Sequence, residues 1–325
     1  MQNSIYDQLF GQGLISENTL KRVKQAHSTT LFSLHWELKV ILYFGIMLLS
    51  AGLGILIYKN IDSISHQLVL TVIAAICIGC FTWCNKHKKP FSYDKVQTHD
   101  SFTDYILLLG TLSFLTFVGY LQYQFEVFGT HYGMATFIPM MVLFFIAYYF
   151  DHLGILTMAI ANLGIWMGIS VTPKHLLSNG TFNNETVIYT YLILGLILMA
   201  AAYLTMYFHI KKHFFFSYYH YSVHLIYISL LAGYFYYNYG VSLIWLAAFA
   251  LAAWYIYMDA MKRKSFYFLL LTVIYSYIAI SGFCIRTLMF IEDSGVLYIG
   301  FIYFIASGIL FINILMNLNK KLKGL

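Results

Sequence analysis

Two histidines within one apolar stretch are the residues best placed to do chemistry. His220 and His224 lie four residues apart in the run 215–236, so they share one face of a helix. At a rise of about 1.5 Å per residue, His224 would lie about 15 Å along that helix, near the middle of a bilayer core about 30 Å thick. An ionisable group at that depth is a functional candidate. It could bind a metal, titrate a proton or contact a ligand, or be a neutral ring bonded to a neighbouring hydroxyl.

Metal chemistry is the most specific of these roles. His209 and His213 precede the pair and give the pattern His-x-x-x-His twice, as in the histidine boxes of membrane di-iron oxygenases. Such enzymes need further histidine-rich boxes on other helices, and the chain has none with paired histidines. His209 and His213 are also expected in or beside a turn. We therefore predict no metal ligands, no catalytic residues and no cofactor.

Two other residues interrupt apolar stretches. Asn162 is central in the run 153–171, where its amide would either bond to another helix or line a cavity. Pro139 lies within the run 133–150, where it removes a backbone hydrogen bond and either kinks the helix or frees a carbonyl. Transporters use such breaks to build sites, although single prolines are common in membrane helices.

An acid and a histidine separate two of the apolar stretches. Asp151 and His152 form a tight turn between the runs 133–150 and 153–171. Such a pair could relay protons at the mouth of a helical bundle. The alternative is a solvated turn in which the aspartate caps the following helix.

The elements that must position these residues are apolar helices. Of the 325 residues, 60% are hydrophobic and only 10% are charged, whereas a soluble domain carries about 25% charged residues. Ten continuous apolar runs are long enough to span a membrane as helices. They do not alternate between apolar and polar residues as the strands of a β-barrel do. They are 38–58, 67–84, 105–122, 133–150, 153–171, 187–208, 215–236, 241–258, 266–285 and 295–318.

The basic residues predict the orientation. If all ten runs cross the membrane, 16 of the 19 Lys and Arg fall on the side that holds both termini, and 3 fall on the other. Because positive charge stays inside, both termini are predicted to be cytoplasmic. The basic residues lie in short loops, which argues against nucleic acid as a partner despite the net charge of +6.

The sequence thus predicts an all-α integral membrane protein with three parts. Residues 38–318 form the bundle of about ten transmembrane helices, and residues 319–325 form a basic cytosolic tail. Residues 1–37 form a short cytosolic helical segment, in which Ser16 is a candidate N-cap. This segment could pack on the bundle or dock a membrane or cytosolic protein partner. The bilayer itself is the other expected partner.

The start of the chain resembles a known family. The segment Gly13-Leu14-Ile15-Ser16-Glu17 is followed by a glycine-rich span from Tyr43 to Lys59, and Asn60 comes directly after this span. Together they look like the start of domain-of-unknown-function family 2157, which comprises predicted bacterial membrane proteins. Asn60 is followed by Ile61, where the family pattern has Trp. The resemblance, mainly over residues 13–60, implies a location in the bacterial inner membrane and supplies no activity or site residues.

Three functions remain open. The chain lacks a phosphate-binding loop and a Gly-x-Ser-x-Gly motif, which argues against an ATPase or a serine hydrolase. The leading hypothesis is a non-enzymatic protein, either permease-like or lipid-facing. The alternatives are an assembly or sensory subunit that works through residues 1–37, and a histidine-based membrane metalloenzyme.

Overall fold

The chain folds into two compact units. The computed structural model describes residues 11–13, 15–20, 34–59, 65–96, 101–129, 132–171, 185–288 and 296–323. One unit comprises Met1–Ser63 and the other Ile64–Leu325.

The first unit contains a capped helical turn and one long apolar helix. Residues 17–20 are helical, and the backbone N–H of Thr19 donates to Ser16 Oγ over 3.3 Å. This contact has the N-cap geometry predicted for Ser16. Helix α3 (Leu34–Lys59) covers the predicted stretch 38–58. Residues 1–10, 14 and 21–33 of the predicted cytosolic segment lie outside the described residues.

The second unit is built from nine long helices in the described part of the chain. Each coincides with one of the predicted apolar stretches, and a short 3-10 turn, η1 (Lys212–Phe214), precedes α10. The helices are α4 (His66–His87), α5 (Ser101–Phe125), α6 (Tyr132–Phe150), α7 (Leu153–Val171), α9 (Glu185–Tyr207), α10 (Phe215–Tyr236), α11 (Tyr239–Lys262), α12 (Phe266–Leu288) and α13 (Val296–Lys323).

Seven helices of the described chain are long and apolar enough to cross a membrane, namely α4, α5, α6, α9, α11, α12 and α13. Helices α3 and α7 carry shorter apolar segments, Val40–Leu56 and Leu153–Gly168. Helix α10 is not among these spans, and it contains two histidines together with several tyrosines and serines. The secondary structure of the described residues is thus helical, and several of the helices could span a membrane. That the chain crosses the membrane ten times remains a prediction.

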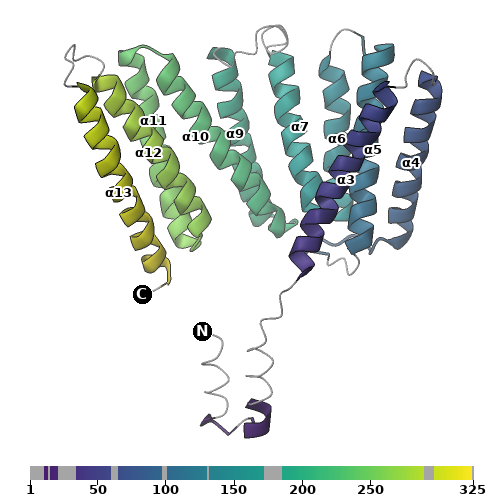
Figure 1. The fold of residues 1–325 in the computed structure, drawn as a ribbon, viewed down its shortest axis with the longest axis horizontal. Coiled ribbons are helices and arrows are strands. Elements are labelled where there is room, and N and C mark those ends of the chain that lie inside the picture. The colour runs from purple at the N-terminus through teal and green to yellow at the C-terminus, as the bar shows by residue number, and fades with distance from the viewer. Residues whose placement is uncertain are drawn as a thin grey trace. The chain divides into compact units, whose positions relative to one another are not determined.

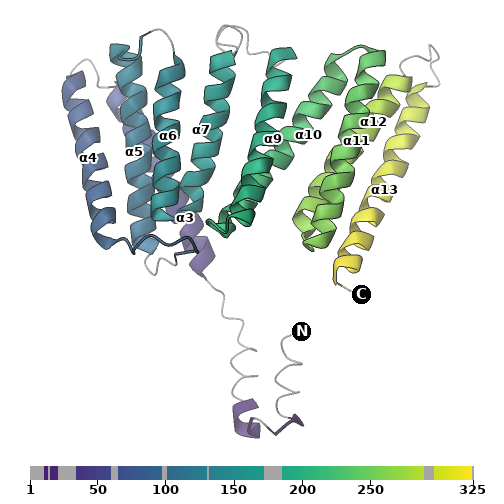
Figure 2. The same cartoon turned by 180° about the vertical axis from the view of Figure 1, so that it is seen from behind.

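Helices of the second unit follow one another in space in the order of the sequence. Figures 1 and 2 show a row that runs from α4 to α13, and each helix packs on the next one along the chain. The pairs α4–α5, α6–α7 and α9–α10 make the most extensive contacts, and α10 also touches α7 and α12. Helix α10 therefore packs on helices on both sides of it in the row, α7 and α9 before it and α11 and α12 after it.

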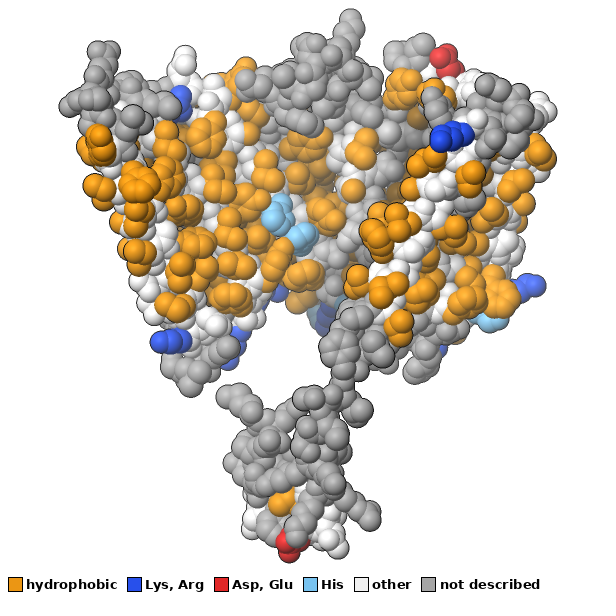
Figure 3. Space-filling view, viewed as in Figure 1, with side chains coloured by type: hydrophobic (Ala, Val, Ile, Leu, Met, Phe, Trp, Pro, Cys, Tyr) orange, Lys and Arg blue, Asp and Glu red, His pale blue; other side chains and the backbone are white. Residues whose placement is uncertain are grey.

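The outer surface of the helices is apolar. Figure 3 shows hydrophobic side chains over the visible helical face, with lysine and arginine toward the helix ends. Large side chains such as Ile244, Leu251 and Phe301 are each 68–70% exposed. A soluble protein rarely leaves so continuous an apolar surface uncovered, whereas a bilayer would cover it.

Close contacts fix α10 between its neighbours. On one side Ser222 Oγ donates to the carbonyl oxygen of Gly195 on α9 over 2.7 Å. On the other side Gly233 packs against the indole of Trp245 on α11, leaving no room for a β-carbon. Small residues at such contacts let helices approach closely in a membrane.

Arg286 ties the end of α10 to α12. Its guanidinium donates to the carbonyl oxygens of Tyr234 (2.8 Å) and Tyr237 (2.7 Å), at the C-terminal end of α10. A cation there satisfies free carbonyls and complements the helix dipole. Helices α10 and α12 are thereby held together near one end, which sets the distance between their side chains further along.

Candidate functional site

The two predicted histidines of α10 meet two tyrosines of α12. His220 Nδ1 lies 2.7 Å from the hydroxyl of Tyr267, and His224 Nδ1 lies 2.8 Å from the hydroxyl of Tyr275. The Tyr267 hydroxyl is also 3.5 Å from His224 Nε2. The rings of His220 and His224 are 4.7 Å apart and nearly perpendicular. We call these four residues the His–Tyr chain.

The His–Tyr chain pairs both ring nitrogens of His224 and the Nδ1 of His220, and these contacts suit neutral imidazoles. A neutral imidazole has one donor and one acceptor nitrogen, and a hydroxyl can donate and accept. Protons can therefore be arranged so that every donor points the same way, from Tyr275 through His224 and Tyr267 to His220. The chain joins α10 to α12 and offers a path along which protons could shift. The geometry agrees with the predicted hydroxyl-bonded histidine and leaves proton transfer open.

Both histidines are only half-buried. Bonding to hydroxyls reduces the free energy that such polar rings lose in an apolar environment. The His–Tyr chain is therefore a partly exposed polar contact between two helices.

The His–Tyr chain is expected to contribute modestly to stability. Replacing Tyr275 with Phe leaves His224 Nδ1 without its hydroxyl and should lower the free energy of unfolding by about 0.6–1.7 kcal/mol, the range of hydrogen bonds between membrane helices. Unfolding in mixed detergent micelles measures this change. Tyr298→Phe is the matched control, because Tyr298 on α13 is 76% exposed. Equal stability of the two variants would contradict a role for the His–Tyr chain in joining α10 to α12.

The other two histidines of the predicted box lie apart from this helix. His209 falls in the turn after α9, and His213 lies in η1, as expected from the sequence. In the part of the chain that the structure describes, no group of three or more His, Cys, Asp or Glu side chains is spaced to hold a metal ion.

Asn162 and Pro139 lie within helices. Asn162 is on α7, and its Oδ1 is buried with no hydrogen-bond partner among the described residues. This oxygen therefore forms no bond to another described helix, and whether the amide bonds across helices or lines a cavity stays a prediction. Pro139 is buried in α6, which continues as one helix from Tyr132 to Phe150.

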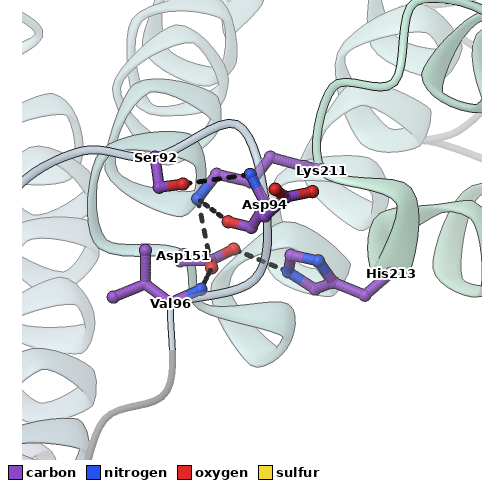
Figure 4. Close-up of polar contacts among 6 residues, drawn as sticks. All are labelled: Ser92, Asp94, Val96, Asp151, Lys211 and His213. Atoms are coloured by element: carbon purple, nitrogen blue, oxygen red, sulfur yellow. Dashed lines mark hydrogen bonds and ion pairs between the residues drawn. The ribbon is translucent and has the colours of Figure 1, made fainter.

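Asp151 is the centre of a second polar cluster (Figure 4). Its Oδ2 lies 3.1 Å from Lys211 Nζ and accepts the backbone N–H of Val96 over 2.6 Å. Its Oδ1 accepts a hydrogen bond from His213 Nε2, also over 2.6 Å. The Asp151 and Lys211 side chains are 3% and 1% exposed. We call Asp151, Lys211 and His213 the Asp151 cluster.

The backbone is shaped to bring the Asp151 cluster together. Asp151 and Lys211 both have positive φ, 59° and 49°. The backbone N–H of Lys211 donates to the carbonyl of Tyr93 (2.8 Å), and its Nζ donates to the carbonyl of Asp94 (3.3 Å). These bonds fix the loop 92–96 against the turn after α9. The cluster thus joins three segments that are distant in the sequence.

The predicted solvated turn at Asp151 is wrong. A carboxylate that is 3% exposed and paired to a buried lysine is not solvated. Nor does Asp151 cap the next helix, since His152 Nδ1 accepts the backbone N–H of Ile155 over 3.2 Å. Burial lowers the pKa of His152, although Asp104 and Asp151 act in the opposite direction. A neutral imidazole with a bare Nδ1 suits this capping role.

Sequence reasoning did not find Lys211. In the sequence this lysine is only one of the basic loop residues that set topology. Its pairing with Asp151 depends on the contact between the α6–α7 turn and the segment after α9, sixty residues away. The adjacent Lys212 is exposed, so the local pattern does not distinguish the buried lysine from its neighbour.

Only the first part of the chain matches a known protein family. Residues 7–156 match the family model described as "Predicted membrane protein (DUF2157)". This match confirms the resemblance predicted from residues 13–60 and extends it to the first turn of α7. No curated protein and no solved structure matches the chain.

Proposed function

We propose, from the premise that residues 7–156 match a family of predicted membrane proteins, that this chain is a non-enzymatic, lipid-facing protein of the bacterial inner membrane. In this proposal it crosses the membrane ten times with both termini in the cytoplasm. Its role is to hold an acyl chain or a similar apolar ligand in the plane of the bilayer. The uneven distribution of Lys and Arg between the two sides supports the orientation.

The observation that carries the proposal is a groove between α11, α12 and α13, which we call the α11–α13 groove. It has a volume of about 600 Å³, and its lining is mainly apolar, with Trp254, Leu310 and Phe311 among its residues. A few hydroxyls lie in it, including those of Tyr277 and Ser307, which bond to each other over 3.2 Å. Ligand pockets commonly have such a lining, with apolar walls and few polar groups.

Helix α13 makes the groove accessible from the bilayer. None of the most apolar 18-residue window of α13 is buried inside the protein. Because one wall of the groove is a helix so exposed, an apolar chain could enter sideways from lipid. The described side chains offer no comparable support for a permease, since both ring nitrogens of His224 are already paired with α12 hydroxyls.

Filling the α11–α13 groove tests the proposal. The protein is placed in nanodiscs that contain a phosphatidylcholine with a photoreactive acyl chain, and crosslinked peptides are mapped by mass spectrometry. We expect labelling within α11–α13 and a several-fold loss in Ala306→Trp, because Ala306 lines the groove. Ile305→Trp is the control, since Ile305 is 52% exposed and points elsewhere on the same helix. Uniform labelling of all helices, unchanged by Ala306→Trp, would overturn the proposal.

A further inference from the structure

A second cavity lies at the opposite end of the row of helices, near the Asp151 cluster. We call it the basic pocket. It has a volume of about 170 Å³ and lies where the loop after α4 meets α5 and the end of α6. Its lining includes Lys88, Lys89 and Lys211 together with the carboxylates of Asp104 and Asp151. With His87 neutral, the lining carries one more positive than negative charge.

One of the two negative charges, that of Asp151, is neutralised inside the protein. Asp151 is paired with Lys211 and His213, so it contributes little negative field to the pocket. Asp104 acts to raise the pKa of the buried His152, against the larger effect of burial, so a neutral ring leaves the Asp104 charge in the pocket. With Lys211 and Asp151 paired, Lys88 and Lys89 stand against Asp104 and leave the basic pocket with one more positive than negative charge. An anion that enters the pocket would lie near the ammonium groups of Lys88 and Lys89, where the surrounding protein strengthens the attraction between opposite charges.

An apolar groove adjoins the basic pocket. This α4–α6 groove has a volume of about 440 Å³ and is lined by residues such as Ile78, Phe81 and Val142. Tyr149 and Phe150 line both the groove and the pocket, so the two cavities are adjacent at these rings. Lys88 Nζ lies 3.4 Å from the centre of the Tyr149 ring, which places a cation where the two meet.

We propose that the basic pocket and the α4–α6 groove together bind one anionic phospholipid. The phosphate headgroup occupies the pocket beside Lys88 and Lys89, and an acyl chain lies along α4 and α6. Charge complementarity selects an anion, and the adjoining apolar groove selects an amphiphile over free phosphate. The small pocket fits a compact headgroup such as glycerol phosphate. In the proposed topology, on which this inference rests, the pocket faces the inner leaflet.

The test is a binding assay on the full-length chain in detergent. Native mass spectrometry measures binding of short-chain phosphatidylglycerol, of phosphatidylcholine with the same chains, and of inorganic phosphate. We expect phosphatidylglycerol to bind more tightly than the other two. The double variant Lys88→Gln/Lys89→Gln should weaken its binding roughly 10- to 30-fold, the loss expected from two lysines near a lipid headgroup. The control Lys262→Gln/Lys264→Gln removes the same charge from an exposed turn elsewhere and should leave binding unchanged.

A variant of the groove separates the lipid from a free anion. Val142→Phe fills the α4–α6 groove without changing the charge of the basic pocket, so it should weaken lipid binding while weak phosphate binding persists. The proposal is overturned if both phospholipids bind equally, if the two lysine variants behave alike, or if phosphate binds as tightly as lipid. Because the assay is done in detergent, it does not depend on membrane orientation. The α11–α13 groove lies on other helices, so that proposal can fail or stand independently.

Discussion

Asp151→Asn is expected to lower the free energy of unfolding by about 3–5 kcal/mol, the loss seen when one partner of a buried ion pair is removed. The variant leaves the Lys211 ammonium, 1% exposed, without its countercharge. It also weakens the bond from His213 Nε2. Asparagine tolerates the positive φ of 59° at this position, so the backbone should not be strained. Unfolding in mixed detergent micelles and the thermal midpoint measure the loss.

Two further variants show whether charge is the cause. Asp151→Asn/Lys211→Met removes both charges and should recover part of the lost stability, because no buried charge is left unpaired. Asp94→Asn is the matched control, since only the backbone carbonyl of Asp94 contacts Lys211. If the double variant is no more stable than Asp151→Asn alone, the buried lysine is not what destabilises the protein.

Gly233→Ala is expected to lower the free energy of unfolding by about 1–3 kcal/mol through overpacking. A β-carbon at Gly233 would overlap Trp245 Cε3, so the indole or the helix must move. The indole is poorly able to shift, because its ring packs against Tyr189 (5.4 Å between centroids) and stacks on Tyr237 (5.7 Å). The contact between α10 and α11 should therefore loosen, which unfolding in mixed micelles would record.

A glycine in open space provides the matched control. Gly119 lies within α5, and a β-carbon added there would meet no described atom within 4 Å. Gly119→Ala should therefore gain up to about 1 kcal/mol from helix propensity. Gly233→Ala/Trp245→Phe should restore part of the loss, because the smaller ring makes room. Equal effects of the two alanine substitutions would show that Trp245 does not limit the approach of α11.

Helix positions could be predicted well from the sequence. The bounds 153–171 and 215–236 are those of α7 and α10, and the other helices begin and end within a few residues of the predicted stretches. Continuous apolar runs and charged or polar loops determine these limits, so local pattern is enough. The spacing of His220 and His224 likewise predicted their shared face.

The partners of the candidate residues could not be predicted. The chain has 29 tyrosines, and nothing local singles out Tyr267 and Tyr275 as those that α12 presents to α10. Lys211 is one of many basic loop residues, and its burial follows from packing between distant turns. The expectation of a solvated Asp151 was wrong for the same reason. Such contacts depend on how helices are ordered in space, which hydrophobicity alone does not determine.

The order of helices in the second unit has a consequence for biosynthesis. Because each helix packs chiefly on the next one along the chain, the hairpins α4–α5, α6–α7 and α9–α10 can form as soon as their second helix has been made. Contacts between residues near in sequence also close with a small loss of chain entropy. A nascent chain could thus pack its helices one hairpin at a time while translation continues, before the carboxyl-terminal helices have been made.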